Sequence, residues 1–375
     1  MVAVLFLISC YLLIYAIFLW RLLGGFGKVP RFTYQQNSTE TGFTVIVPFR
    51  NEEKNLPDLL KSFEQLDYPR EQVEFIFIDD FSTDDSARVV NRWRLDNPTI
   101  HTTMIDSVRM SASPKKDAIQ RAIPIALHNW IVTTDADCKV PTGWLSVYDS
   151  FIRERKVRMC CGPVRYQTRF NICDYFQQAD MMALQGVTIA SFGLGRAFMC
   201  NAANFAFEKS FFQEIGGFNG VDGVASGDDV FLLQKAVAKN PDAVSYLKSR
   251  EAIVTAKPAN SWIDLFHQRV RWASKSKSYI SNYGESLALV TFFGNLTLLL
   301  AMILAIAGAA DWRIVAAMFL FKFIPDYILA LRAKLFIDGK FFFPIISGLL
   351  YPLFSSIVGL YSLYGVYRWK GRTLR

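Results

Sequence analysis

Closely spaced carboxylates occur at three points of the chain, each beside an apolar run. Two pairs follow the runs EFIFI and WIVTT, and the third precedes the apolar residues 230–233. The pairs are Asp79 with Asp80, Asp135 with Asp137, and Asp228 with Asp229. Carboxylate oxygens can ligate a hard divalent cation, accept a ligand's hydrogen bond, or remove a proton. These are the residues with which the chain could do chemistry.

The Asp135–Ala136–Asp137 group follows a strand-like run directly. In a loop, this spacing can direct both carboxylates at one point, where they would suit Mg²⁺ or Mn²⁺ carrying a diphosphate. The alternative is a solvated turn, or a cap for a helix that starts near Pro141.

The other two pairs suggest different roles. Asp80 ends a strand, where its carboxylate can accept a hydrogen bond from a base or a ribose. Ser82 and Asp84 can cap the helix that follows it. One of Asp228 and Asp229 could deprotonate an acceptor hydroxyl as general base, and the other could start a helix.

A basic and aromatic group lies near residue 270. Gln268, Arg271 and Trp272 stand at i, i+3 and i+4 of a helix-like stretch, so they can share one helix face. An indole and a guanidinium on one face could bind a sugar and a phosphate. The alternative is that they anchor the neighbouring membrane segment.

The elements that position these residues alternate between strand-length apolar runs and longer amphipathic stretches. This pattern predicts an α/β fold with a mostly parallel sheet and flanking helices. We expect strands at residues 43–48, 74–78 and 130–134, and helices at residues 54–66 and 84–94. Each strand-end acid would lie at the carboxyl edge of the sheet, where such sheets bind ligands. Neither GxGxxG nor GxxxxGK[ST] occurs, which argues against dinucleotide-binding dehydrogenases and P-loop enzymes.

Hydropathy separates the membrane-like parts of the chain from this central region. Of 375 residues, 52% are hydrophobic, and the long apolar runs are residues 2–23, 287–310, 314–331 and 341–366. Runs of this length can span a bilayer, and the first lacks the basic start of a cleaved signal peptide. We therefore expect a transmembrane anchor at 1–24, a catalytic domain at 40–260, an interfacial segment at 261–285, transmembrane segments at 286–367 and a basic tail at 368–375.

Basic residues predict how these segments are oriented in the membrane. Arg21, Lys28 and Arg31 follow the first run, and Lys275 and Lys277 precede the second, so the positive-inside rule predicts a multi-pass protein with a cytoplasmic central domain. Three further crossings would leave the tail, with Arg368, Lys370, Arg372 and Arg375, outside. One of the later segments would then not cross fully, and residues 314–331, which contain Lys322, Pro325 and Asp326, are the candidate.

Charge and cysteine content exclude other classes. The net charge is +8, but the basic residues cluster beside hydrophobic segments, which favours anionic membrane lipids over nucleic acid. The 6 cysteines and 3 histidines show no zinc-ligand spacing, and reduced thiols suit a cytoplasmic domain.

Five stretches in a fixed order, VIVPFRNEE, IDDFSTDD, TTDADC, SGDD and QRVRW, resemble the family 2 glycosyltransferases. The resemblance is to the membrane-bound branch that includes ceramide glucosyltransferase and the cellulose and hyaluronan synthases, and it covers roughly residues 43–276. It implies a GT-A nucleotide-sugar fold. It also implies inverting transfer, in which an acceptor hydroxyl attacks the anomeric carbon as the nucleoside diphosphate leaves.

The resemblance also implies roles for individual residues. Asp135 would lie beside the nucleotide, Asp137 would ligate Mg²⁺ or Mn²⁺, and Asp229 would be the base. The remaining residues fall into three groups: Pro48, Arg50, Glu52 and Asp80 for the nucleoside, Lys115 or Lys116 for the phosphates, and Gln268, Arg271 and Trp272 for the acceptor and diphosphate. Arg50 stands where many members have tyrosine, and Pro114 where glycine usually precedes the phosphate-side lysine. Cys200, Asn201 and Asn204 could contact the donor sugar or belong to an ordinary packed loop.

The expected function is transfer of a sugar from a nucleotide donor to a lipid or lipid-linked acceptor at the cytoplasmic membrane face. The family resemblance implies a uridine diphosphate sugar as the donor. One alternative is a processive polysaccharide synthase with a glycan acceptor. Another is a non-catalytic membrane scaffold, which the presence of all the required acids disfavours.

Overall fold

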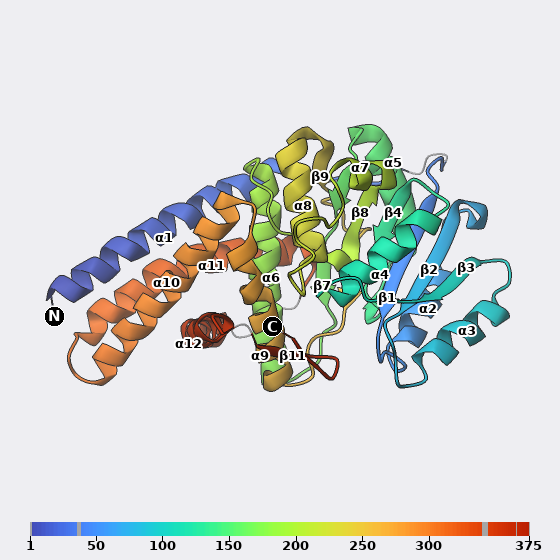
Figure 1. Cartoon of the computed structure of the whole chain (residues 1–375). Coiled ribbons are helices and arrows are strands. Elements are labelled where there is room, and N and C mark those ends of the chain that lie inside the picture. The colour runs from blue at the N-terminus through green and yellow to red at the C-terminus, as the bar shows by residue number, and fades with distance from the viewer. Residues whose placement is uncertain (1, 36–38, 340–343, 365, 375) are drawn as a thin grey trace. The chain divides into compact units, whose positions relative to one another are not determined.

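The computed structural model describes residues 2–35, 39–339, 344–364 and 366–374, and the chain forms two compact units (Figure 1). The helical unit comprises Met1–Val29, Thr168–Ala197 and Pro258–Arg375. The sheet unit comprises Pro30–Gln167 and Phe198–Lys257. Both units are therefore built from separate stretches of sequence.

The sheet unit is organised around a seven-stranded sheet in the order β3-β2-β1-β4-β8-β6-β9. Strands β3, β2, β1 and β4 are mutually parallel, β8 is antiparallel to β4 and β6, and β9 is parallel to β6. The strands are β1 (Phe43–Phe49), β2 (Val73–Asp79), β3 (His101–Asp106), β4 (Trp130–Thr133), β6 (Met159–Cys161), β8 (Phe205–Glu208) and β9 (Val244–Tyr246). A smaller sheet has the order β5-β10-β7, with β5 (Cys138–Lys139), β7 (Val164–Tyr166) and β10 (Val254–Ala256).

The predicted strands at 43–48, 74–78 and 130–134 are confirmed as β1, β2 and β4. Their side chains are almost continuously buried, as expected of parallel strands covered on both faces. Parallel register aligns their carboxyl ends, because Phe49 of β1 lies opposite Asp79 of β2, and Asp79 opposite Asp106 of β3. The acidic loops therefore leave the sheet at one edge.

Helices connect these strands. The helices predicted at 54–66 and 84–94 are α2 (Leu56–Glu64) and α3 (Ser86–Asp96). The others are α4 (Pro114–Ala122), α5 (Trp144–Arg155), α7 (Lys209–Glu214) and α8 (Asp228–Lys239), with the short 3₁₀ helices η1 (Arg70–Gln72), η2 (Ile123–Ile125), η3 (Ala202–Asn204) and η4 (Pro241–Ala243). Together with the sheet, they confirm the predicted α/β class.

The helical unit contains the predicted hydrophobic segments. Its helices are α1 (Val2–Lys28), α6 (Ile172–Gly193), α9 (Trp262–Ser274), α10 (Asn282–Ile306), α11 (Trp312–Ile337) and α12 (Pro344–Ser362), with the 3₁₀ helix η5 (Lys275–Ser278). A hairpin of β11 (Tyr367–Trp369) and β12 (Arg372–Leu374) follows. Among the described residues, four helices are long and apolar enough to cross a membrane: α1, α10, α11 and α12.

Helix α6 belongs to the helical unit, although the sequence suggested one continuous domain from 40 to 260. It packs against α1 and α11 through small residues that allow close backbone approach. A Cβ atom on Gly193 would lie 1.9 Å from the carbonyl oxygen of Gly25, and one on Gly186 would lie 2.9 Å from Leu329. The sheet unit is therefore interrupted between Gln167 and Phe198.

The charges in α11 are paired within the bundle. The Lys322 ammonium donates to Asp326 at 2.7 Å and lies 4.6 Å from the ring centre of Tyr15, whose hydroxyl donates to Asp326 at 2.5 Å. Pro325 lies inside a helix that continues without a break. A paired charge need not face lipid, so these contacts are compatible with a crossing α11, and the candidate at residues 314–331 stays a prediction.

Helix α12 runs in a different direction from the other three long apolar helices. Figure 1 shows α12 end-on, whereas α1, α10 and α11 are seen from the side and lie next to one another. Val358 of α12, Tyr367 of β11 and Val270 of α9 form one buried cluster, and Lys277 donates to the carbonyl of Leu363 at 2.9 Å. The start of the predicted last segment, at residue 341, and Arg375 of the predicted tail lie outside the described residues.

Candidate active site

A lysine joins two of the three acidic groups at the carboxyl edge of the sheet. The Lys115 ammonium lies 2.5 Å from Asp135 Oδ1 and 3.4 Å from Asp228 Oδ2. Lys115 is in the first turn of α4, Asp135 follows β4, and Asp228 begins α8. The structure thus brings together residues separated by more than a hundred positions.

The charge of Lys115 is maintained by its surroundings. Burial alone would lower its pKa, but the carboxylates of Asp135, Asp228 and Asp229 outweigh burial and raise the pKa above its ordinary value. The side chain therefore remains a cation and offsets the repulsion among the acids. A fixed positive charge at this point also suits a diphosphate.

The neighbouring Lys116 has a different environment. It is 1% exposed, and its ammonium donates to the carbonyls of Val221 and Val224 at 2.5 and 2.8 Å. It also lies 4.9 Å from the ring centre of Phe231. These contacts tie α4 to the loop that leads into α8, so Lys116 is placed to hold that loop.

Asp229 is held by backbone groups. Its Oδ2 accepts from the amide of Ala202 at 2.9 Å, and its Oδ1 from the amide of Val230 at 2.7 Å. Thr133 of β4 donates to the carbonyl of Ala202 at 2.7 Å, and Gly227, with φ +83°, gives the turn before α8 a conformation that favours glycine. The carboxylate orientation is therefore fixed by three elements.

One group among the described residues could hold a metal ion, and it consists of Asp135, Asp137 and Cys138. Ligand atoms of the three residues lie within 4.8 Å of one another. Burial, with the nearby charges of Asp137 and Asp135, raises the pKa of the Cys138 thiol well above its ordinary value, so the thiolate needed for ligation is disfavoured. The two carboxylates remain, and hard oxygen donors fit Mg²⁺ or Mn²⁺.

The loops after β1 and β2 meet through Arg50 and Asp80. Arg50 Nη1 donates to the Asp80 carbonyl at 2.7 Å and also to the carbonyl of Phe81. Arg109 pairs with the Asp80 carboxylate and lies 5.3 Å from the ring centre of Phe81. Phe81 has φ +58° and is 52% exposed. Sequence reasoning missed Arg109, because no motif marks an arginine 29 positions from its partner. Phe81 lies inside the IDDFSTDD stretch but was given no role.

Glu52 and Asp84 support these loops. The Glu52 amide donates to Ser86 Oγ at 2.7 Å, and its carboxylate accepts from Asn55 at 2.5 Å. Asp84 accepts from the amide and hydroxyl of Ser86 at 3.1 and 2.5 Å. Although burial raises the pKa of Asp84, these hydrogen bonds lower it overall. The N-cap residue of α3 is Asp85, which makes no side-chain cap hydrogen bond, and Ser82 accepts from the Asn51 amide, so neither predicted residue is the cap. Pro48 lies within β1, opposite Ile78.

Asn204 is part of the core. Its side chain donates to the carbonyls of Pro163 and Ala252 at 2.8 and 2.7 Å, and accepts from Trp144 and Tyr148 at 2.9 and 2.8 Å. Because all four hydrogen bonds are made inside the protein, the packed-loop interpretation applies to Asn204. Asn201 caps η3 by accepting from the amide of Ala203, and Cys200 is buried.

The remaining predicted site residues, Gln268, Arg271 and Trp272, lie on α9 in the helical unit. All three are half-buried. The acids and lysines of the candidate site belong to the sheet unit. The sequence therefore assigns one site to residues from two units, and this assignment stays a prediction.

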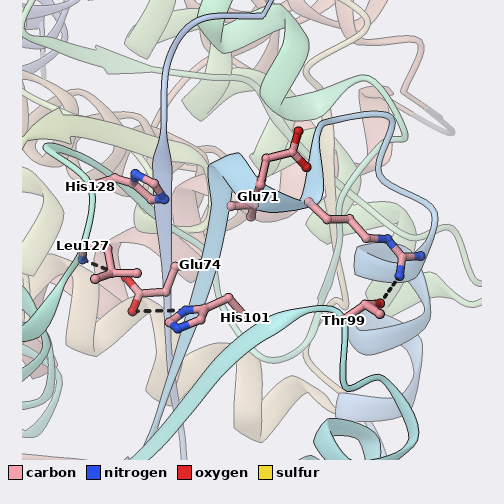
Figure 2. Close-up of a pocket in the computed structure, with 8 residues that line it drawn as sticks. Glu71, Glu74, Thr99, His101, Leu127 and His128 are labelled. Carbon is pink, nitrogen blue, oxygen red and sulfur yellow. Dashed lines mark hydrogen bonds and ion pairs between the residues drawn. The ribbon is translucent and has the colours of Figure 1, made fainter.

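A cavity of about 370 Å³ lies at the opposite, amino end of the strands (Figure 2). Glu74 lines it and accepts from Thr44 and from the Leu127 amide at 2.8 and 2.9 Å, while His101 Nδ1 is 3.6 Å from its carboxylate. Burial lowers the pKa of His128, which also lines the cavity. Glu74 fixes the turn before β4, and none of the predicted site residues is here.

Comparisons with known proteins show the fold and the family of the chain. A mannosyltransferase from Pyrobaculum calidifontis, solved with GDP-mannose and Mn²⁺, superposes with a TM-score of 0.57 at 17% identity over 94% of this chain and 98% of that one. Poly-beta-1,6-N-acetyl-D-glucosamine synthase of Staphylococcus epidermidis is 22% identical over 237 residues, which are 62% of this chain and 54% of that protein. The poly(ribitol-phosphate) beta-N-acetylglucosaminyltransferase TarS of Staphylococcus aureus is 40% identical over 52 residues, 14% of this chain and 9% of TarS.

The chain thus spans about half or less of these two sequence relatives. The structural similarity shows the GT-A fold and confirms the fold that the sequence resemblance implied. Residues 1–351 match the family described as Glycosyl transferase family 21, which is consistent with the resemblance to ceramide glucosyltransferase. The chain belongs to glycosyl transferase family 21.

Proposed function

We propose that this glycosyltransferase moves a sugar from a nucleoside diphosphate sugar to a lipid or lipid-linked acceptor at the cytoplasmic face of a membrane. The observation that carries the proposal is the contact of Lys115 with both Asp135 and Asp228. This contact places the acids proposed for the donor diphosphate next to those proposed for the acceptor.

The donor would bind across the carboxyl edge of the sheet. Asp80 would accept from the base, with Arg50 and Glu52 holding its loop and Arg109 beside it. Asp135 and Asp137 would hold Mg²⁺ or Mn²⁺, which as a Lewis acid neutralises the charge of a diphosphate leaving group. Lys115 would contribute a second positive charge on the same side.

The acceptor hydroxyl would lose its proton to Asp229. The acceptor oxygen then forms a bond to the anomeric carbon, while the bond from that carbon to the diphosphate oxygen breaks with inversion. Backbone amides of Ala202 and Val230 aim the Asp229 carboxylate, which is the orientation that a general base needs. Asp228 would stay paired with Lys115.

Contacts within the helical unit support a proposal for the membrane arrangement. The β11 strand and α12 pack on α9, and α9 follows the sheet unit with no described candidate span between Pro30 and Ser281. We propose that α1, α10 and α11 cross the membrane, whereas α12 lies along its cytoplasmic surface. The basic tail then stays on the side of the sheet unit, as the positive-inside rule favours.

A processive polysaccharide synthase is the second candidate. Its supporting observation is the similarity to poly-beta-1,6-N-acetyl-D-glucosamine synthase over 62% of this chain. Three crossing helices offer little material for a polymer channel within one chain, which favours a single transfer to a lipid.

We expect nucleoside diphosphate to be released from only one nucleotide sugar of a panel, and only when lipid is present. The test incubates the purified, detergent-solubilised protein with Mn²⁺ and a panel of nucleotide sugars, with and without a total lipid extract. A gel of the product made from the radiolabelled donor should show one discrete lipid-linked species. A ladder, or release that ignores lipid, would favour the polymer synthase.

Lys115→Met and Lys116→Met should differ in their effect on turnover, and each is the matched control for the other. Lys116→Met leaves the carbonyls of Val221 and Val224 without their donor, at about 1–3 kcal/mol for each such group, so the melting temperature should fall. Lys115→Met should also lower the melting temperature, because Asp135 and Asp228 lose their shared cation. Unlike Lys116→Met, it should turn over about 10²-fold more slowly, the order expected for loss of one preorganised charge-stabilising donor. Equal turnover by wild type and Lys115→Met would exclude the proposed role.

Asp137→Asn and Asp229→Asn should separate the metal role from the base role. Asp229→Asn should bind the nucleotide sugar as wild type does in titration calorimetry, yet lose about 10²–10⁴-fold in turnover, the usual contribution of a general base. Asp137→Asn should need more Mn²⁺ for half-maximal activity. Asp242→Asn, at an exposed position in η4, is the control. Full wild-type activity in excess chelator would exclude the metal-binding role of Asp137.

Cysteine labelling tests the proposed crossings. In a Cys10→Ser background, a membrane-impermeant maleimide is applied to sealed vesicles of each orientation. Lys370→Cys in the tail should react from the same side as Asn97→Cys in the sheet unit, and Ala309→Cys between α10 and α11 from the other. If Lys370→Cys instead reacts from the same side as Ala309→Cys, α12 crosses the membrane.

A further inference from the structure

An arginine that the proposed site does not use lies inside the QRVRW stretch. Arg269 is 7% exposed and Asp180 of α6 is 4% exposed. Arg269 Nε donates to Asp180 Oδ2 at 2.6 Å, and Nη2 lies 2.5 Å from the same oxygen. Tyr351 of α12 also hydrogen bonds to Asp180. Asp180 thus joins α6, α9 and α12 within the helical unit.

Arg269 contacts two of the residues proposed for the acceptor side. Its Nη1 donates to Gln268 Oε1 at 2.5 Å, and its guanidinium carbon lies 4.2 Å from the ring centre of Trp272. A guanidinium at this distance from an indole forms a cation–π contact. One buried cation therefore restrains both an amide and an indole on α9.

We propose that Arg269, fixed by Asp180, is a positioning residue that makes Gln268 present its NH₂ group and holds the plane of Trp272. The proposal rests on the function proposed above for Gln268 and Trp272. Because Oε1 of Gln268 accepts from Arg269, the amide is oriented with its two donors free of that contact. Gln268 is then suited to donate to an oxygen of the acceptor or the diphosphate.

The energetics favour positioning over stability as the reason for this ion pair. Removing two charges from water costs several kcal/mol per ion, and apolar residues of similar volume often stabilise such a position equally well. A buried pair is useful where one geometry must be chosen among several. Here the chosen geometry is that of Gln268, since the same guanidinium that contacts Asp180 also contacts its amide.

The first test is Gln268→Glu. This change keeps the shape of the side chain and its contact with Arg269, but replaces the NH₂ donor by an oxygen. We expect a melting temperature no lower than that of the wild type and at least about a 10²-fold loss in kcat for transfer, with the donor KM changed less than about threefold. Wild-type turnover by Gln268→Glu would overturn the proposal.

The second test is the double variant Asp180→Leu with Arg269→Met, which removes both charges and so leaves neither buried alone. We expect it to fold with a melting temperature close to wild type and to lose about tenfold or more in kcat. Asp174→Asn is the matched control, because Asp174 is a buried carboxylate of α6 paired with Arg169 and does not contact Gln268. If the double variant turns over as fast as wild type, the pair is structural only.

A readout without turnover separates this proposal from the proposed function. In the ¹⁹F spectrum of protein labelled with 5-fluorotryptophan, the Trp272 resonance is assigned as the one that Trp272→Phe removes. That resonance should shift or broaden in the double variant and stay unchanged in Asp174→Asn. If the resonance shifts in the double variant but the wild-type protein transfers no sugar, the proposed function alone is refuted. If the resonance does not shift in the double variant, the positioning role is refuted.

Discussion

Carboxylates repel one another, and the candidate site brings several of them to one edge of a sheet. The Lys115 ammonium makes this arrangement stable by lying between Asp135 and Asp228, and the same acids keep it charged. The balance also joins elements of the fold, because Lys115 on α4 contacts the loop after β4 and the start of α8. Lys116 and Ser113 tie α4 to the loop before α8. Adjacent lysines on one helix turn therefore divide two tasks, one facing the acids and the other fixing the backbone that presents them.

The same division of tasks recurs in the helical unit. Lys322 and Asp326 satisfy each other inside α11, with Tyr15 completing the contact from α1. Arg269 and Asp180 do so between α9 and α6. In both places a charge is accommodated in an apolar setting by a partner that also fixes the position of a second helix. Glycines complete the packing, since α6 approaches α1 closely only because Gly193 and Gly25 lack side chains.

The sequence predicts the parts of the fold that have strong local signals. Strands β1, β2 and β4 are continuous apolar runs, and the acids after them are visible as motifs. Strand β3 was missed because it is a half-exposed edge strand, and β6, β8 and β9 because three or four residues carry little periodicity. The assignment of α6 to the helical unit could not be predicted, since its partners α1 and α11 lie far away in sequence. Arg109 and the role of Lys116 depend on contacts that no spacing encodes. For Asn204 the sequence left a donor-sugar contact and a packed loop open, and its four internal hydrogen bonds favour the packed loop.

The insertion of α6 between β7 and β8 has a consequence for biosynthesis. Strand β8 lies in the middle of the large sheet, between β4 and β6, yet the ribosome makes it only after α6. The sheet therefore cannot close until the chain has left the nascent domain and returned. Helix α6 must meanwhile wait for α11, which is translated more than a hundred residues later. A shortened version cut at both ends of the sheet unit would still carry α6 with the surfaces for α1 and α11 exposed, and such surfaces promote aggregation. Residues 168–197 are therefore the first segment to redesign for soluble production of the sheet unit.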